Sequence, residues 1–397
     1  MGISNLLPFL KPVTCYTHLK NLISNCTLLI FFGKIGRYRG KHVGIDAMCW
    51  IHRGASSCAF ELLNDEPTDK FLKFILSMLE LLRFYEVLPL LVFDGLQIPA
   101  KKFEDHKRNT KRDAAKKEAR RLIKEKPNPR DNREILSKCQ QAVSIDQAMI
   151  DQVIAVCKAL DVKFIVAPYE ADAQLAYLCR KGDVAAVISE DSDLLAYGCP
   201  HVLYKLDKAG NCQEIDMTFL LSIPSSIKLK TAQQTTDNRA FQLGEGAIDL
   251  ISQLRKLSQP MFTDMCILSG SDYAQDVHLK GMGIKTALHF ILQHKSLRNT
   301  LKCLLVDPKW SDRIVKFLPF EEVNKKYVEA QVAFYHHIIY DIGRDCLTYT
   351  KEVHTELPHF DLSNTDIKEI VGSPPENYQE YAYGELNPRN GCKRSIM

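Results

Sequence analysis

The sequence lacks the features that define several large protein classes. None of its stretches approaches the roughly 18 consecutive apolar residues of a membrane-spanning helix. None of its 13 cysteines stands in a Cys-x-x-Cys pair, and their number is odd, so neither a zinc ribbon nor a disulfide framework is expected. Scattered cysteines of this kind favour a reducing, intracellular compartment. The 46% of hydrophobic residues excludes widespread disorder.

Motifs for nucleotide cofactors and zinc proteases are missing as well. Gly40-Lys41 lacks both the upstream glycine and the following Ser or Thr of a P-loop. Gly281-Met-Gly283 follows no predicted strand and has no third glycine, so it is not a dinucleotide fingerprint. No His-Glu-x-x-His is present. A nucleotide cofactor is therefore not predicted.

Positive charge is concentrated in one segment. The net charge of the whole chain is only +4, but residues 101–126 contain twelve Lys and Arg against five Asp and Glu. The rest of the chain is therefore slightly acidic. A basic segment on such a body favours a polyanionic partner.

Short apolar runs separated by helical patterns predict an α/β fold with a central, twisted parallel sheet flanked by helices. The runs are residues 42–46, 88–94, 163–167, 184–189 and 201–206. Residues 101–150 read as charged helices broken near residues 126–129, and residues 222–246 as a loop rich in Ser, Thr and Gln. From residue 261 the pattern is mostly helical until it turns polar after residue 372.

Acidic residues follow four of the predicted strands. Because parallel strands end at one edge of a sheet, these carboxylates should converge on one crevice. Taken singly, an Asp at a strand end is more often a helix cap. Taken together, six carboxylates repel one another unless cations neutralise them, and oxygen ligands suit Mg²⁺ or Mn²⁺. Two such ions would activate a water and stabilise the leaving oxygen of a phosphodiester. The six are Asp46, Asp94, Glu170, Asp172, Asp191 and Asp193.

The basic segment places cations at helical spacing. Lys101 lies seven residues before Arg108, on the same face if the helix starts that early, and the stripe continues every four residues through Arg112, Lys116 and Arg120. A solvated surface helix is the alternative interpretation. Because the basic segment follows closely after Asp94, we expect its helix to lie above the acidic crevice, where Lys101 and Arg108 would bind a phosphate.

Several motifs together resemble the structure-specific 5′ nucleases of the flap endonuclease and xeroderma pigmentosum group G superfamily, most closely its exonuclease branch. The resemblance covers most of residues 1–350. It rests on residues 44–52 (GIDAMCWIH), 91–95 (LVFDG), 167–177 (APYEADAQLAY), 190–198 (EDSDLLAYG), 266–273 (CILSGSDY) and 281–287 (GMGIKTA).

The resemblance implies roles for further residues. It implies that Asp272 and the six acids together form a two-metal site. It also implies that Lys101 and Arg108 are the catalytic basic pair of a helical arch. It implies that His52 stacks on a base near the cut. It also implies that a helix-two-turn-helix holds the DNA backbone with a monovalent cation such as K⁺, through Gly281, Gly283 and Lys285.

The implied activity is a Mg²⁺-dependent 5′→3′ double-stranded DNA exonuclease that also cuts 5′ flaps and leaves 5′-phosphates in DNA repair. The alternatives are a replication flap endonuclease and a catalytically impaired DNA-binding homologue. Duplex DNA with a 5′ end or flap is the implied partner, for a monomer in the nucleus. Mismatch-repair partners stay open, because the long tail that binds them in the family is not among these residues.

The organisation that we expect has five parts, two of which depart from the family. Residues 14–35 look like an insertion, and residues 222–246 are also extra. The parts are an N-terminal nuclease region 1–100, the arch 101–150, an internal nuclease region 151–260, the helix-two-turn-helix region 261–350 and a short extension 351–397.

Overall fold

A computed structural model describes most of the chain. The described residues are 2–11, 14–16, 30–126, 128–222, 245–315, 319–350, 364–376, 378–388 and 390–394. The loop expected at residues 222–246 and the interior of the expected insertion therefore lie largely outside them. No helix in these ranges is long and apolar enough to cross a membrane.

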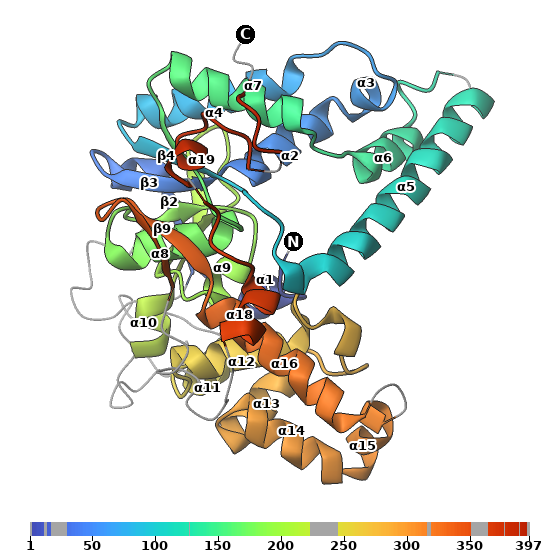
Figure 1. The fold of residues 1–397 in the computed structure, drawn as a ribbon, viewed down its shortest axis with the longest axis vertical. Helices are drawn as coiled ribbons and strands as arrows, with labels where there is room; N and C mark the ends of the chain where they lie inside the picture. The colour runs from blue at the N-terminus through green and yellow to red at the C-terminus, as the bar shows by residue number, and fades with distance from the viewer. Residues whose placement is uncertain are drawn as a thin grey trace.

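An eight-stranded sheet forms the centre of the molecule (Figure 1). Its order is β1-β2-β8-β7-β6-β3-β4-β5, and β3 to β7 all run parallel. The strands are β1 (Thr14–Tyr16), β2 (Ile30–Lys34), β3 (His42–Asp46), β4 (Leu88–Phe93), β5 (Lys163–Val166), β6 (Val187–Ile188), β7 (His201–Tyr204) and β8 (Asn211–Asp216). The predicted α/β fold and its five parallel strands are confirmed.

Three strands extend this sheet beyond the prediction. β8 runs antiparallel to β7, and β2 runs antiparallel to β8, with β1 at the edge. β1 and β2 come from the expected insertion at residues 14–35. Three strands separate β2 from β3, so the described ends of this segment lie at the sheet edge away from β3.

Helices cover both faces of the sheet, because alternate strand residues point to opposite sides. Ile45 and Phe93 enter one buried cluster, whereas Val92 and Ile165 enter the other. The first cluster packs under α2 (Ala47–Ser57), α3 (Ala59–Leu63), α4 (Lys70–Phe84) and α7 (Gln147–Ala159). The second packs under α1 (Leu6–Leu10), α8 (Ala171–Lys181), α9 (Asp193–Ala196) and α12 (Gln259–Gly270).

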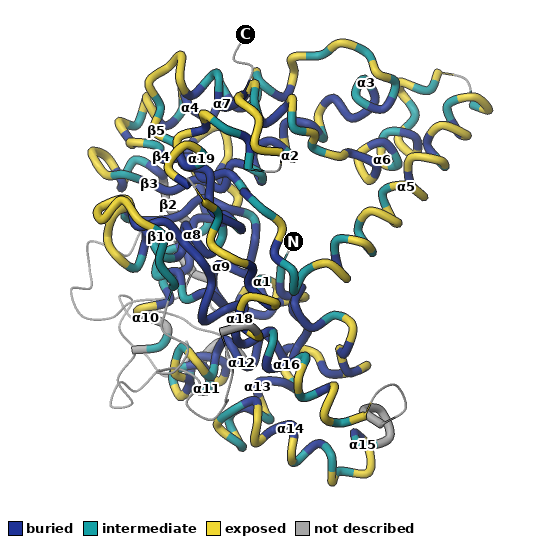
Figure 2. The backbone as a smooth tube through the Cα atoms, viewed as in Figure 1, coloured by how far each residue is buried: buried dark blue, intermediate teal, exposed yellow. Residues whose placement is uncertain are grey.

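A long charged helix projects from the sheet and is braced by a second one (Figure 1). η4 (Pro99–Lys101) leads into α5 (Lys102–Glu125), which packs against α6 (Arg133–Ala142). Ala115, Ala119 and Leu122 are the buried positions along the outer half of α5. Figure 2 shows the rest of this helix largely exposed. The helix break predicted near residues 126–129 is confirmed by the gap between α5 and α6.

The rest of the chain is mostly helical, as predicted, with one hairpin that the sequence did not indicate. The helices are α10 (Met217–Ser222), α11 (Glu245–Leu254), η6 (Gln275–Val277), α13 (Ile284–His294), α14 (Leu297–Val306), α15 (Pro308–Val315), α16 (Phe320–Tyr335), α18 (Asn364–Val371) and α19 (Tyr378–Ala382). β9 (Ile338–Asp341) and β10 (Cys346–Tyr349) pair antiparallel after α16. The side chain of Gln174 on α8 hydrogen-bonds the backbone of Tyr340 in both directions, which ties this hairpin to α8.

Candidate active site

The predicted acids gather at the edge of the sheet where the parallel strands end. Asp46 is the last residue of β3, and its side chain caps α2 by accepting a hydrogen bond from the Cys49 amide at 3.0 Å. Asp94 follows β4 and accepts from the Ala171 amide at 2.8 Å. The chain runs from β3 outward to β4 and β5, and later from β6 outward to β7, so the crevice between β3 and β6 is a topological switch point.

The two remaining acidic pairs lie at or near the N-termini of two helices and enter the same crevice. Glu170 is the N-cap of α8, and Asp172 lies in its first turn. Asp191 accepts a hydrogen bond from the amide of Asp193, the first residue of α9, at 3.0 Å. Acidic side chains are favoured at helix N-termini, which lets the fold hold these charges close together.

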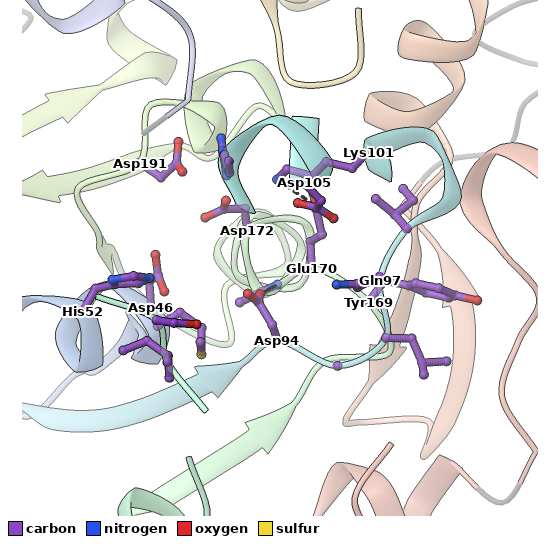
Figure 3. Close-up of a pocket in the computed structure, with 18 of the residues that line it drawn as sticks. Asp46, His52, Asp94, Gln97, Lys101, Asp105, Tyr169, Glu170, Asp172 and Asp191 are labelled. Atoms are coloured by element: carbon purple, nitrogen blue, oxygen red, sulfur yellow. Dashed lines mark hydrogen bonds and ion pairs between the residues drawn. The ribbon is translucent and has the colours of Figure 1, made fainter. Parts of the chain in front are cut away.

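A cavity of about 320 Å³ joins these acids to the base of α5 (Figure 3). Asp46, Asp94, Glu170, Asp172 and Asp191 line it from the sheet side. Asp193 and Asp272 are 2% and 6% exposed and lie beside it. The residues that line it from η4 and α5 are Lys101, Asp105, Arg108, Asn109 and Arg112.

Two cations from the arch reach the acids directly. The ammonium of Lys101 lies 2.8 Å from Glu170 Oε1 and 3.4 Å from Asp272 Oδ2. The Arg108 guanidinium lies 2.6 Å from the same oxygen of Asp272 and 3.2 Å from Glu104 Oε1. Asp272 does not follow a strand and could not be predicted from the strand order. It joins the cluster from just after the end of α12.

The electrostatics of the cluster fit a cation. Burial, and then the neighbouring Asp46, raises the pKa of Asp94 to about 7. Burial and the nearby carboxylates also raise the pKa of Asp172 and of Asp193 well above the ordinary range. One buried oxygen of Asp172 and one of Asp193 have no hydrogen-bond partner. Unpaired carboxylate oxygens of this kind are suitable ligands for Mg²⁺.

The acids line a cavity rather than a closed coordination shell. In the described ranges, no three His, Cys, Asp or Glu side chains converge closely enough to form a ready-made metal centre. Glu170, like Asp272, has a compensating positive charge close by. Burial alone would raise the pKa of Glu170, but Lys101, His337 and Tyr273 together lower it to about 2.

The residues expected to bind DNA fall into two groups. His52 and Arg112 line the cavity. Lys116 and Arg120 lie farther along α5 and are exposed to solvent. Gly281, Gly283 and Lys285 lie outside the cavity, around the N-terminus of α13. There Gly281 has a φ of +90°, Gly283 caps the helix, and Lys285 is exposed.

Two kinds of supporting residue were not predicted. The Ser189 hydroxyl donates to Asp46 Oδ2 at 2.9 Å and accepts from the Asp191 amide at 2.9 Å, so it links acids from two strands. Tyr197 and Tyr273 contact Glu170. Ser189 lies two residues before Asp191, and Tyr197 and Tyr273 lie within the motifs at residues 190–198 and 266–273, so these positions were the signals that could have found them.

Raising the pH should destabilise the metal-free protein between about pH 4, where an unfolded Asp ionises, and pH 7. In this window the folded protein retains protons on Asp94 that the unfolded chain releases, so stability falls as the pH rises. Glu170 is ionised in the fold throughout this window and opposes the fall only below about pH 5.5, where an unfolded Glu still binds protons. Burial lowers the pKa of His337 to about 4, so His337 opposes the fall up to about pH 6.5, whereas the raised pKa values of Asp172 and Asp193 add to it. Thermal unfolding in EDTA should show a falling midpoint, by roughly 2–4 °C per kcal/mol, which Mg²⁺ restores most at the high end. A midpoint that rises from pH 5 to pH 7 would contradict this electrostatic account.

The chain is similar to known proteins over most of its length. The XPG N-terminal domain model matches residues 1–115, and the XPG I-region model matches residues 161–272. The chain is 36% identical over 287 residues to exonuclease 1 of Xenopus laevis, covering 72% of this chain and 32% of that protein. It is 34% identical over 336 residues to exodeoxyribonuclease 1 of Saccharomyces cerevisiae, covering 84% of this chain and 40% of that protein. The chain therefore spans less than half the length of these relatives.

One solved structure shares the fold over nearly the whole chain. It is the catalytic core of Rad2 in complex with a DNA substrate, with a TM-score of 0.53 and 16% sequence identity. The match covers 96% of this chain and 98% of that one.

Proposed function

The chain belongs to the XPG family of nucleases, and from that membership we propose that it is a divalent-metal-dependent hydrolase that degrades double-stranded DNA from a 5′ end and cuts 5′ flaps. Cleavage leaves 5′-phosphates. The observation that carries the proposal is the meeting of an acidic cluster at the switch point of the sheet with Lys101 and Arg108 from the base of a projecting basic helix.

Seven acids would hold the metal, which we propose to be two Mg²⁺ ions that Mn²⁺ can replace. They are Asp46, Asp94, Glu170, Asp172, Asp191, Asp193 and Asp272. When bound, two divalent ions supply an activated water and stabilise the leaving oxygen of a phosphodiester. The buried, unpaired oxygens of Asp172 and Asp193 support this assignment.

Lys101 and Arg108 are the proposed catalytic cations of the chain itself. Both reach the cavity from the arch, and both now neutralise carboxylates there. With DNA bound, each would donate hydrogen bonds to the scissile phosphate as negative charge develops on it. His52 lines the same cavity and would stack on the base beside the cut.

DNA farther from the cut would contact two more surfaces. Arg112, Lys116 and Arg120 continue the basic side of α5 and would attract the phosphate backbone. Gly281, Gly283 and Lys285 surround the N-terminus of α13, and a Cβ at Gly283 would meet no atom within 4 Å. Accessible backbone amides at a helix N-terminus favour binding of a phosphate. We also propose that this helix-two-turn-helix binds the monovalent ion K⁺.

The proposed biological setting rests on the resemblance to this family of nucleases. We propose that the protein acts in the nucleus, in mismatch repair, end resection and recombination, as a monomer on duplex DNA with a 5′ end or flap. The five parts predicted from the sequence are the proposed organisation. The described ends of the 14–35 segment lie at the far edge of the sheet, which favours an active nuclease over an impaired homologue.

Two labelled DNAs test the activity. Purified protein with Mg²⁺ should progressively shorten a 5′-recessed duplex from its 5′ end and should also cut a double flap, and EDTA should stop both reactions. Cutting confined to the flap would assign the protein as a flap endonuclease instead. Binding to both DNAs without cleavage in Mg²⁺ or Mn²⁺ would overturn the proposed activity.

A further inference from the structure

Two buried phenols meet at one oxygen of Glu170. Tyr197 is the C-cap of α9 and Tyr273 directly follows Asp272, and the two residues are 5% and 3% exposed. The Tyr273 hydroxyl donates a hydrogen bond to Glu170 Oε2. The Tyr197 hydroxyl lies 3.3 Å from the same oxygen and is also hydrogen-bonded to the Tyr273 hydroxyl. Three side chains from separate segments therefore share one polar contact.

The other oxygen of Glu170 is committed to Lys101. The Lys101 ammonium lies 2.8 Å from Oε1, and it also lies 5.8 Å from the centre of the Tyr273 ring. Both oxygens of this carboxylate thus have partners, unlike those of Asp172 and Asp193. Glu170 is oriented by the phenols on one side and orients Lys101 on the other.

Aromatic packing fixes the two phenol rings. Phe334, near the end of α16, lies 4.8 Å from the Tyr197 ring centre and 5.0 Å from that of Tyr273. His337 packs edge-on against Tyr197 at 5.9 Å. Because both rings are buried and packed against Phe334, their hydroxyls cannot easily turn away from Glu170.

We propose that Tyr197 and Tyr273 are positioning residues which, by holding Oε2 of Glu170, fix Oε1 and so hold the ammonium of Lys101 at the cavity. The inference rests on the proposed role of Lys101 in cleavage. A lysine is a point charge on a flexible four-carbon stem, so its position depends on what anchors it. Without the phenols, Glu170 would be free to rotate and Lys101 would lose a fixed partner.

Tyrosine-to-phenylalanine variants separate this role from packing, since they keep the ring and remove only the hydroxyl. Tyr273→Phe should lower kcat by about 10-fold to 100-fold, with the KM for a 5′-recessed duplex unchanged within about twofold. Tyr197→Phe should have a smaller effect in the same direction. Tyr327→Phe is the matched control, because Tyr327 is equally buried and its hydroxyl contacts only the Val277 carbonyl in the described hydrogen bonds.

Combination with Lys101→Ala gives the decisive comparison. If the phenols act through Lys101, Tyr273→Phe should cause no further loss of kcat in a K101A background. Multiplicative losses in the double variant, or a wild-type kcat for both phenylalanine variants, would overturn the proposal.

Thermal unfolding without metal or DNA tests this inference independently of the proposed nuclease activity. In EDTA, Tyr273→Phe should lower the unfolding midpoint more in the wild-type background than in a Glu170→Ala background, where only its hydrogen bond to the Tyr197 hydroxyl remains to be lost. Equal shifts in both backgrounds would show that the phenol does not act on Glu170. If the wild-type protein cleaves no DNA, the proposed function fails, while this thermodynamic cycle still tests the contact.

Discussion

Asp193→Ala should reduce DNA cleavage by on the order of 10³-fold while leaving DNA binding within a few-fold of wild type. Asp193 is 2% exposed and carries a buried oxygen that has no hydrogen-bond partner among the described residues, which supports its proposed role as a metal ligand rather than a role in holding the fold. The proposed DNA contacts on α5 and α13 lie on other elements, and binding should therefore persist. Single-turnover cleavage and fluorescence anisotropy with the same duplex measure the two properties separately.

The same variant should lose activity without losing thermal stability. Burial, and then Asp191 and Asp272, raise the pKa of Asp193, which means that its charge is unfavourable in the folded state. Removing it should leave the unfolding midpoint in EDTA equal or higher. Glu190→Ala is the control, because Glu190 is 41% exposed and accepts from the Lys205 amide outside the cavity. Cleavage at the wild-type rate by Asp193→Ala would refute the metal-site assignment.

Arg108→Ala should slow cleavage by about 10²-fold with a smaller change in DNA affinity. Arg108 contacts Asp272 at 2.6 Å and Glu104 at 3.2 Å, so its guanidinium is held at the cavity before any DNA arrives. A group placed in advance stabilises developing charge without reorganisation at the moment of reaction. Its removal should therefore appear in kcat more than in KM.

Arg121→Ala is the matched control for the same helix. Arg121 is 53% exposed and pairs with Glu118 at 2.7 Å along the outside of α5. Its loss should change the cleavage rate less than twofold, since exposed ion pairs contribute little. Equal effects of the two substitutions would mean that the basic stripe acts only through general attraction for DNA.

The centre of the fold could be predicted because it is periodic and buried. Runs that are apolar throughout, separated by helices, identified all five parallel strands, and β3 has the predicted bounds of His42–Asp46. The antiparallel strand β8 was missed, since four of its six residues 211–216 (NCQEID) are polar and give no continuous apolar run. The β9–β10 hairpin was missed because its contacts are made with α8, far away in the sequence.

The same distinction applies to the site. Six acids could be placed from strand order alone, since the geometry of a parallel sheet determines where its strands end. Asp272 follows a helix, and only the resemblance to a family suggested it. The roles of Ser189, Tyr197 and Tyr273 depend on side-chain packing in three dimensions, for which a single sequence contains no periodic signal.

The wide separation of the acids along the chain has a consequence during protein synthesis. Asp46 and Asp272 are separated by more than half of the polypeptide. Asp272 is therefore the last of the seven acids to be synthesised, just after α12. At 5–20 residues per second, Asp272 is added roughly 10–45 s after Asp46. A nascent or prematurely terminated chain that ends before this point lacks one of the seven acids. If these acids form the proposed metal site, translation delays its completion until most of the surrounding fold has been made.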